Sequence, residues 1–341
     1  MPLTAPADRA FCREMLPKVS RTFALCIRFL PPGVEYAVLV AYLLCRIADT
    51  IEDTVRLSAA DKRRLLAIFS ALLDEGAGDA GALRRAFLDP VTYDESLALE
   101  ADRVLREFRG LPADQRSAVR PWVQEMCAGM ATFATDGSGQ LEALASVEEL
   151  DRYCYFVAGT VGHLLTALFL LHHGRATEQR RKQLESLATS FGLGLQLTNI
   201  IKDIADDRQR GRSYVPRQLT QLVGIDPEQI QDAGHVDQSR EVMELLIEKA
   251  SGHLRDALDY CIALPRSQYS IRLFCLTSLY FAVRTLHRAK HDPRLLDPTH
   301  KVKITRAEVY RTVLVAHVVA PMNSLVRAYF RHLAGGMAAT A

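Results

Sequence analysis

Apolar residues recur at helical spacing along almost the whole chain, and alternating, strand-like runs are nearly absent. Such spacing puts apolar side chains on one face of a helix, so it favours helices with a buried face. Three helix starts are marked by a hydroxyl residue with an acid three positions later: Ser58, Ser146 and Thr305. Helix-breaking residues fall between the periodic segments, among them Pro31-Pro32, Gly211, Pro216, Pro265 and Pro298. We therefore expect an all-α protein of about ten helices without a sheet.

Nothing in the sequence divides the chain into parts. It has no low-complexity linker, no fixed-period repeat and no block of like charges, and 341 residues can build one large core. We predict a single domain over residues 1–341, with a last helix over about residues 305–334 and no membrane anchor after it.

Charge and cysteine content exclude some partners and compartments. The 42 basic and 40 acidic residues leave a net charge of +2, so no excess of positive charge is present to follow a nucleic-acid backbone. The seven cysteines are scattered without a CxxC pair, which predicts reduced, buried thiols and a reducing compartment. The N-terminus carries no export signal, and the apolar stretches 155–171 and 312–326 are too short or too interrupted for a membrane span. We expect a cytoplasmic protein.

Two acidic clusters share one spacing, in which an acid is followed by two more at i+3 and i+4. The first comprises Asp49, Glu52 and Asp53, and the second Asp203, Asp206 and Asp207. Residues so spaced lie on one helix face. Each face continues backward as a polar stripe: Tyr42 and Arg46 on the first helix, Gln196 and Asn199 on the second.

A solvated helix face is the common fate of such clusters, but three features weigh against it. The apolar neighbours predict burial, where unpaired carboxylates do not stay charged. Like charges at i and i+4 repel. Asp206 and Asp207 lie near a predicted helix C-terminus, where the helix dipole disfavours anions. We therefore expect bound cations, and oxygen ligands without His or Cys suit Mg²⁺, with Asn199 and the six acids as candidate ligands.

Basic residues accompany both clusters: Arg46, Lys202 and the run Arg208, Arg210, Arg212. A diphosphate group needs such cations beside metal-binding acids, although a solvated turn is the alternative for the run around Gly211. A third segment, residues 153–162, carries Gly159 and Gly162 at helical spacing. Glycine weakens a helix, so this pair indicates either close helix packing or the wall of a cavity.

At these residues the sequence resembles the squalene/phytoene synthase family of head-to-head prenyltransferases. Residues 49–53 match the family's first aspartate-rich motif, and residues 199–207 match the second. Residues 153–162 match the tyrosine motif between them, and residues 20–23 match a further N-terminal motif. Order and spacing agree over about residues 16–312.

The resemblance implies an isoprenoid-synthase helical bundle with a central cavity, Mg²⁺ as cofactor and two farnesyl diphosphates as substrates. It implies catalytic roles for Tyr153, Asp49, Asp53, Asp203 and Asp207, and Tyr153 would assist diphosphate departure and proton removal. The residues implied to grip diphosphate are Ser20, Arg21, Arg46, Lys202 and Arg212. Those implied to line the substrate pocket are Phe23, Tyr42, Val157, Gly159, Val161, Gly162 and Gln196.

Features of two branches of the family occur together. Residues 49–53, 274–279 and 301–304 resemble the squalene-forming branch, which implies reduction by NADPH. Lys301 and Lys303, two cations in the polar connection just before the helix start at Thr305, are candidates to meet a phosphate of NADPH, and a solvated loop is the alternative for this pair. Residues 210–216 and Phe156 resemble the non-reducing branches that make dehydrosqualene or phytoene. The sequence thus favours squalene, with dehydrosqualene, presqualene diphosphate or phytoene as alternatives.

Two further readings remain beside catalysis of this kind. The intact acids and Tyr153 argue against a family-like scaffold that serves only as an assembly factor. The Asp-Asp-x-x-Asp spacing of head-to-tail synthases is absent. We expect a monomer that touches the membrane surface through its last helix, where the mostly apolar run 313–319 accompanies Arg311, Arg327, Arg331 and His332.

Overall fold

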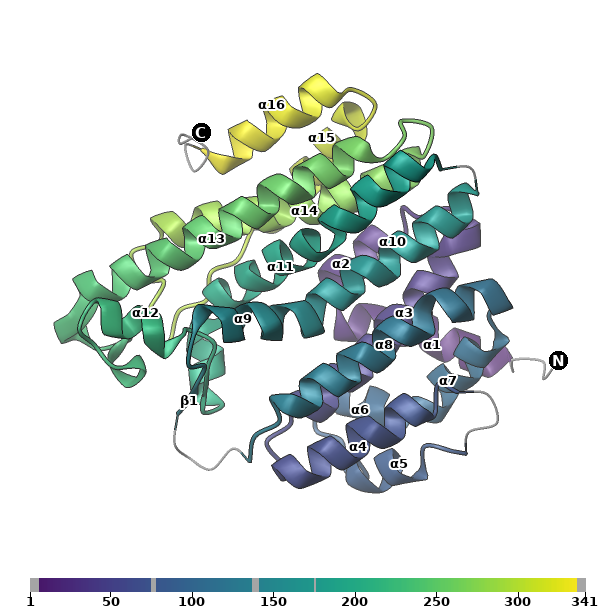
Figure 1. Cartoon of the computed structure of the whole chain (residues 1–341), viewed down its shortest axis with the longest axis horizontal. Helices are drawn as coiled ribbons and strands as arrows, with labels where there is room; N and C mark the ends of the chain where they lie inside the picture. Colours follow the sequence, from purple (N-terminus) through teal and green to yellow (C-terminus); the bar gives the residue numbers. More distant parts are fainter. Residues whose placement is uncertain (1–5, 75–77, 137–140, 175, 336–341) are drawn as a thin grey trace. The chain divides into compact units, whose positions relative to one another are not determined.

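The computed structural model describes residues 6–74, 78–136, 141–174 and 176–335. Sixteen α-helices make up nearly all the regular structure of these residues (Figure 1), which confirms the all-α prediction. The expected number of about ten is too low because helices such as α5 (Gly81–Ala86) and α6 (Tyr93–Leu99) are too short to show a clear period. The prediction of no sheet is wrong by one pair of two-residue strands, β1 (Glu142–Ala143) and β2 (Arg212–Ser213).

The contacts of the chain group into two compact units. The first comprises Met1–Asp136 and Thr160–Glu185. In it α8 (Ala113–Thr132) packs against α3 (Pro32–Asp53), α4 (Ala59–Ala71) and α10 (Thr160–His173). Its other helices are α1 (Pro6–Val19), α2 (Arg21–Ile27), α5, α6 and α7 (Ala101–Gly110).

The second unit comprises Gly137–Gly159 and Ser186–Ala341. Its centre is α14 (Tyr269–His291), which packs against α13 (Val236–Ala263), α15 (Arg306–Val319) and α16 (Asn323–Ala334). The remaining elements are α9 (Val147–Cys154), the π-helix η1 (Tyr155–Gly159), α12 (Arg217–Leu222), and the short 3₁₀-helices η2 (Pro227–Gln229) and η3 (Ala233–His235). Helix α11 (Glu178–Gln209) begins in the first unit and continues through the second.

The three predicted helix starts are confirmed by their capping bonds. The Ser58 hydroxyl accepts from the backbone N–H of residue 61, and the Ser146 hydroxyl from that of residue 149. Thr305 and Glu308 form a reciprocal capping box at the start of α15. The predicted last helix over about 305–334 is two helices, because Pro321 lacks an N–H and its ring clashes with the preceding turn.

The seven cysteines are free and buried, as the sequence predicts. Among the described residues one helical stretch, Val147–His173, is long and apolar enough to span a membrane. Length and composition are weak support for a span, because core helices of water-soluble proteins pass the same test, and 44% of the apolar window is buried inside the protein. This stretch comprises α9, η1 and α10.

Candidate active site

The first acidic stripe lies on α3. This helix starts with a proline in its first turn, where a missing N–H costs nothing, and most of its residues are buried. The exceptions include Tyr42, Arg46 and Asp49, which are partly exposed, and Asp53, which is exposed. At spacings of three and four residues these side chains form one polar stripe on an otherwise apolar helix, as the sequence predicts.

Arg46 is the centre of the contacts along this stripe. Its Nη2 donates to the Tyr42 hydroxyl at 3.0 Å, and its Nη1 lies 3.8 Å from Asp49 Oδ2. Its Nε lies 3.6 Å from Asp94 Oδ1, yet this buried nitrogen makes no hydrogen bond to any described residue. Burial by itself would lower the pKa of Arg46, but Tyr42, Asp49 and Asp94 raise it by more than burial lowers it. The guanidinium is therefore firmly charged.

Asp49 is short of positive charge. Burial raises the pKa of its carboxyl to about 7; Arg46 opposes this rise, while repulsion from Asp53 and Asp94 adds to it. A carboxyl in this state gains from an added cation, since a positive ion nearby favours the ionised form. The neighbouring thiols are inert, because burial and the Asp49 charge raise the pKa of Cys127 to about 12 and that of Cys45 further.

Glu52 does not share the accessibility of this stripe. Its residue is 1% exposed, whereas Asp53 is exposed. Helical spacing alone would put Glu52 on the same face as Asp49, but its neighbours in the fold cover it. Of the three carboxylates expected on one open face, the fold leaves two accessible and buries Glu52.

Asp94 belongs to this group of charges and was missed by sequence reasoning. It lies in the first turn of α6, whose start is capped by Thr92. An acid at such a place is expected from the helix dipole alone. In the sequence, Asp94 therefore indicated only the start of a helix. The packing of α6 on α3 is what brings its carboxylate to Arg46.

The N-terminal motif reaches the same stripe through one aromatic contact. The Phe23 and Tyr42 rings lie with their centroids 5.6 Å apart. Ser20 is the N-cap of α2, and its hydroxyl accepts from the Phe23 backbone N–H at 3.2 Å. Arg21, the first residue of α2, is exposed. The structure thus gives Ser20 a helix-capping role in addition to any role in binding substrate.

The second acidic stripe lies on α11, in the part that belongs to the second unit. Asn199 is exposed, and Gln196, Asp203, Asp206 and Asp207 are partly exposed. Two cations already neutralise part of this charge. Lys202 Nζ pairs with Asp203, and Lys301 Nζ lies 2.6 Å from Asp206 Oδ2.

The basic run after this stripe divides into separate roles. Arg208 Nε donates to Gln231 Oε1 at 2.8 Å, and its Nη2 donates to the Glu228 carbonyl at 2.7 Å, so it holds a loop. Gly211 turns the chain with a φ of +76°, a value that favours glycine. Arg212 follows in β2, with its guanidinium 5.3 Å from the centroid of the Tyr214 ring.

The tyrosine motif contains the most enclosed polar contact of the second unit's candidate residues. The Tyr153 hydroxyl donates to the Tyr214 hydroxyl oxygen at 2.8 Å, and the rings stack with centroids 4.5 Å apart. Tyr153 is 4% and Tyr214 7% exposed. The parallel pairing of β1 with β2 fixes the segment that carries Tyr214. Sequence reasoning noted residues 210–216 as part of a basic run and as a branch marker but did not single out Tyr214, so this partner of Tyr153 was missed.

Directly after Tyr153 the helix widens into the π-helix η1, which contains Val157 and Gly159. A Cβ on Gly192 would lie 2.1 Å from the Ala158 carbonyl oxygen, so α11 approaches this segment backbone to backbone. A Cβ on Gly159 would lie 3.4 Å from Leu193 Cδ1 of α11, so Gly159 fits the close-packing alternative. Val161 and Gly162 follow in α10 and are partly exposed.

Lys301 and Lys303 lie just before α15 and are both exposed. Lys301 is committed to Asp206, while the Lys303 backbone carbonyl accepts from Arg288 Nη1 at 3.0 Å. Of these two lysines, only Lys303 has an ammonium that makes no ion pair with any described residue.

Each of the two acidic stripes, taken by itself, offers the kind of donor that Mg²⁺ prefers. Asp49 and Asp53 on α3, and the three aspartates on α11, offer carboxylate oxygens, and Asp49 is destabilised without an added cation. Within the described part of the chain, no group of three or more His, Cys, Asp or Glu side chains is close enough to hold a metal ion. Mg²⁺ is commonly bound by only one or two carboxylates together with water and substrate phosphate.

A model of the squalene/phytoene synthase family matches residues 16–308, a range that includes both acidic stripes and Tyr153. The chain belongs to the squalene/phytoene synthase family. Squalene synthase from Candida albicans is 30% identical over 334 residues, which span 94% of this chain and 70% of the relative. Squalene synthase from Rattus norvegicus is 27% identical, spanning 94% of this chain and 73% of the relative.

Solved structures of this family have the same fold. A complex of TcSQS with a ligand is 26% identical and superposes with a TM-score of 0.80, covering 98% of this chain and 94% of that one. A dehydrosqualene synthase, 20% identical with a TM-score of 0.63, supports the fold alone. The family and the squalene-synthase-type helical fold predicted from the sequence are thereby confirmed.

Proposed function

We propose that this member of the squalene/phytoene synthase family is a prenyltransferase that joins two farnesyl diphosphates head to head, forms presqualene diphosphate and reduces it to squalene with NADPH. The observation that carries the proposal is that the family match over residues 16–308 contains both acidic stripes and the buried Tyr153 intact. Relatives that bear the name squalene synthase support the same activity.

In this proposal the chain's charged residues bind and orient the substrate diphosphates. The firmly charged Arg46 clamps phosphate oxygens through its donors, and Arg212, Arg21 and Lys202 add positive charge. Asp49, Asp53, Asp203, Asp206 and Asp207 would hold Mg²⁺, with Asn199 beside them, and the ion when bound neutralises the charge that develops on the departing diphosphate. Glu52 would contribute only if α3 or its neighbours moved, because it is buried.

Tyr153 supplies the proton chemistry of the first half-reaction. When the allylic diphosphate leaves, the double bond of the second chain attacks the carbocation, and loss of a proton closes the cyclopropane ring. The Tyr153 hydroxyl is enclosed and oriented by Tyr214, so it can give its proton to the departing diphosphate and, as the phenolate so formed, take up the proton that is lost at ring closure. The apolar residues proposed to line the pocket, such as Val157, exclude water that would capture the cation.

The contact between Lys301 and Asp206 weakens the proposal of a reductive step with NADPH. Lys301, proposed to meet a phosphate of NADPH, is neutralised by Asp206 at 2.6 Å. That contact favours a second candidate function, a non-reducing synthase that makes dehydrosqualene, presqualene diphosphate or phytoene. We retain squalene as the product because Lys303 keeps an exposed ammonium without an ion pair among the described residues.

One incubation separates these functions. The purified chain is given farnesyl diphosphate and Mg²⁺, with and without NADPH, and its products are identified by mass spectrometry. Squalene only with NADPH, and presqualene diphosphate or rearranged alcohols without it, supports the proposal. Dehydrosqualene in both reactions moves the protein to the non-reducing branch. Phytoene is a C40 product, so a parallel reaction supplies geranylgeranyl diphosphate, and a chain that forms no product from either substrate fits the assembly-factor alternative.

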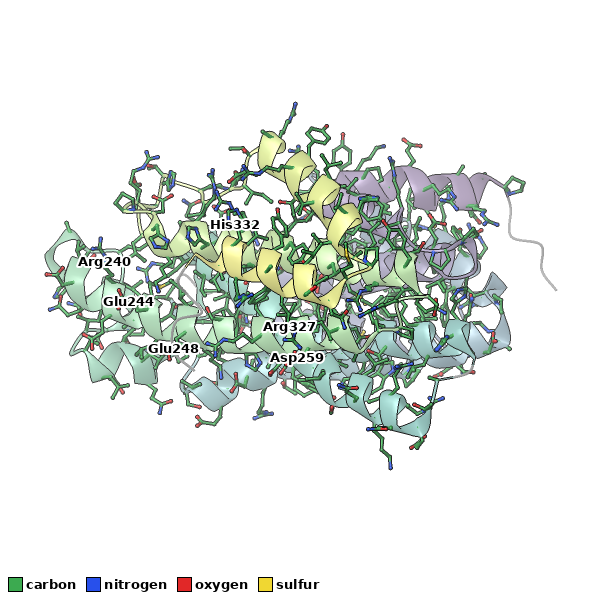
Figure 2. The ribbon with its side chains drawn as sticks, turned by 90° about the horizontal axis from the view of Figure 1, so that it is seen from above. Arg240, Glu244, Glu248, Asp259, Arg327 and His332 are labelled. Atoms are coloured by element: carbon green, nitrogen blue, oxygen red, sulfur yellow. The ribbon has the colours of Figure 1, made fainter. Side chains whose placement is uncertain are left out.

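The metal assignment has its own test. We expect Asp49→Asn and Asp203→Asn each to lower turnover about 100-fold or more, because each removes a carboxylate proposed to hold the cation through which the diphosphate is bound. Glu244→Gln on the exposed side of α13, labelled in Figure 2, is the matched control and should retain full activity. Circular dichroism checks that all three stay helical. Near-normal turnover of both aspartate variants would refute the assignment.

We further propose that the protein acts in the cytoplasm as a monomer. The seven free, buried cysteines support a reducing compartment. Light scattering during gel filtration measures the oligomeric state, and a dimer mass would contradict this part.

A further inference from the structure

Helix α15 turns three large apolar side chains toward solvent. Tyr310, Leu314 and Val318 are 73%, 68% and 60% exposed. Since they are spaced by four residues, they form one continuous row, which we name the α15 stripe. On its other side α15 buries residues such as Thr312 and Ala316, where the helix packs against α14 and α16.

Two further large apolar residues are exposed after the end of α15. Met322, in the turn, is 44% exposed, and Leu325, in the first turn of α16, is 39% exposed. The sequence placed a membrane contact on the run 313–319, but the fold divides that run between the two faces, and Val319 is buried. Large exposed apolar patches on a folded protein mark interaction sites. The α15 stripe is therefore the part of this segment that can meet a partner.

The segment that carries the stripe is rich in basic residues. Residues 301–341 contain six lysines and arginines and a single acid, Glu308, in a chain whose total charge is only +2. Glu308 is buried and held by Arg284 Nε at 2.8 Å and by Arg288 Nη2 at 2.9 Å. The one negative charge of this segment is thus both withdrawn from the surface and neutralised.

Several of the six cations are available to a partner. Lys303, Arg306, Arg311 and Arg331 make no ion pair with any described residue. Arg306 precedes Tyr310 by four residues and so extends the row at its N-terminal end, whereas Arg311 lies beside it on the helix surface. The stripe is apolar along its length and basic at its border.

Two of the residues expected from the sequence to meet the membrane are already engaged. Figure 2 shows Arg327 of α16 beside Asp259 of α13, and their charged groups are 3.3 Å apart. His332 stacks on the Tyr329 ring with centroids 6.0 Å apart. The free cations lie instead along α15 and at Arg331.

We propose that the α15 stripe docks on an anionic phospholipid surface. Helix α15 lies in the plane of the interface, Leu314 and Val318 enter the acyl boundary, and Tyr310 stays at the headgroup level. Arg306 and Arg311 meet lipid phosphates. A lipid surface fits better than an acidic protein, because a bilayer accepts an apolar row and its basic border together without a shaped groove.

The experiment measures sedimentation of the purified chain with sucrose-loaded vesicles. One set of vesicles mixes phosphatidylcholine with phosphatidylglycerol, and the other contains phosphatidylcholine alone. The test variant is Tyr310→Ser/Leu314→Ser/Val318→Ser. The matched control is Leu88→Ser/Val91→Ser/Leu222→Ser, whose wild-type residues are 62%, 80% and 71% exposed elsewhere. A charge variant, Arg306→Gln/Arg311→Gln, removes the two border cations.

We expect the wild type and the control to bind the anionic vesicles, more weakly as salt is added, and to bind neutral vesicles poorly. The serine variant should lose binding, and the charge variant should bind about five-fold more weakly for each cation removed. Unfolding in urea should be unchanged in all variants, since the substituted side chains are exposed.

Equal loss in the control and serine variants, or no binding by the wild type, overturns the proposal. A concentration-dependent dimer that the serine variant abolishes would also overturn it, because the occupant would then be a second copy of the chain. No readout is enzymatic, so the result stands apart from the proposed catalytic function.

Discussion

The hydrogen bond between Tyr153 and Tyr214 makes a prediction about both stability and turnover. Tyr214→Phe removes one hydroxyl and keeps the ring, whose centroid lies 4.5 Å from that of Tyr153. The lost bond is 2.8 Å long and joins two side chains that are at most 7% exposed. A buried bond of this kind contributes about 0.5–1.5 kcal/mol, and leaving a partner less satisfied adds to the cost. We expect the free energy of unfolding to fall by about 1–2 kcal/mol.

A double-mutant cycle isolates the contribution of this pair. Urea unfolding of Tyr153→Phe, Tyr214→Phe and the double variant should give a coupling energy of about 1 kcal/mol, because either single change already removes the bond. Tyr280→Phe is the matched control. Its buried hydroxyl donates to the Val326 carbonyl at 3.1 Å, so it should lower stability by a similar amount without coupling to Tyr153.

Turnover adds a readout that stability alone does not move. If Tyr214 orients the Tyr153 hydroxyl, Tyr214→Phe should lower kcat about tenfold, the equivalent of about 1.4 kcal/mol. The same change made in the Tyr153→Phe background should have no further effect, and Tyr280→Phe should leave kcat unchanged. A coupling energy within the ~0.5 kcal/mol error of additivity, or an equal kcat loss in both backgrounds, would refute the reasoning.

Three further predictions concern packing and charge. Arg284, Arg288 and Thr305 outweigh burial and hold the pKa of Glu308 at about 2, below its ordinary 4.5. The Glu308→Gln variant should therefore have a free energy of unfolding that is lower by about 1–2 kcal/mol at neutral pH. Urea titrations should show this difference disappearing as the pH falls from 4.5 toward 2. Gly192→Ala should lower the melting temperature and the stability, by about 1–3 kcal/mol, because the new Cβ would collide with the Ala158 carbonyl. In the control Gly252→Ala on α13, the new Cβ meets no atom within 4 Å, so this variant should be more stable by about 0.5–1 kcal/mol. Arg272→Met should lower the free energy of unfolding in urea by several kcal/mol, on the order of 3. The fully buried guanidinium donates to backbone carbonyls that would be left without this hydrogen-bond donor. A Met variant as stable as the wild type would contradict this role.

Local features of this protein follow from the sequence alone. Helical periodicity, capping residues such as Ser58 and Thr305, and the polar stripe through Arg46 and Asp49 each depend on residues within about four positions of one another. Interactions at that range form in any helix that the segment makes. For this reason the helical class, the family and the two acidic stripes could be read before the fold was known.

Tertiary packing decided which of those residues can work together. The approach of Asp94 to Arg46, of Tyr214 to Tyr153 and of Lys301 to Asp206 joins separate elements, and in the last pair the residues are 95 positions apart. Packing also buried Glu52 while leaving its neighbour Asp53 exposed.

The α15 stripe shows the same division. The sequence displays an apolar run at 313–319, but which side faces water depends on where α14 and α16 lie. Burial is a property of what surrounds a side chain, and the surroundings come from distant parts of the chain. The sequence therefore determined the helices and their chemical stripes, and the tertiary structure alone decided which charges are neutralised, which carboxylates stay accessible and which apolar face remains open.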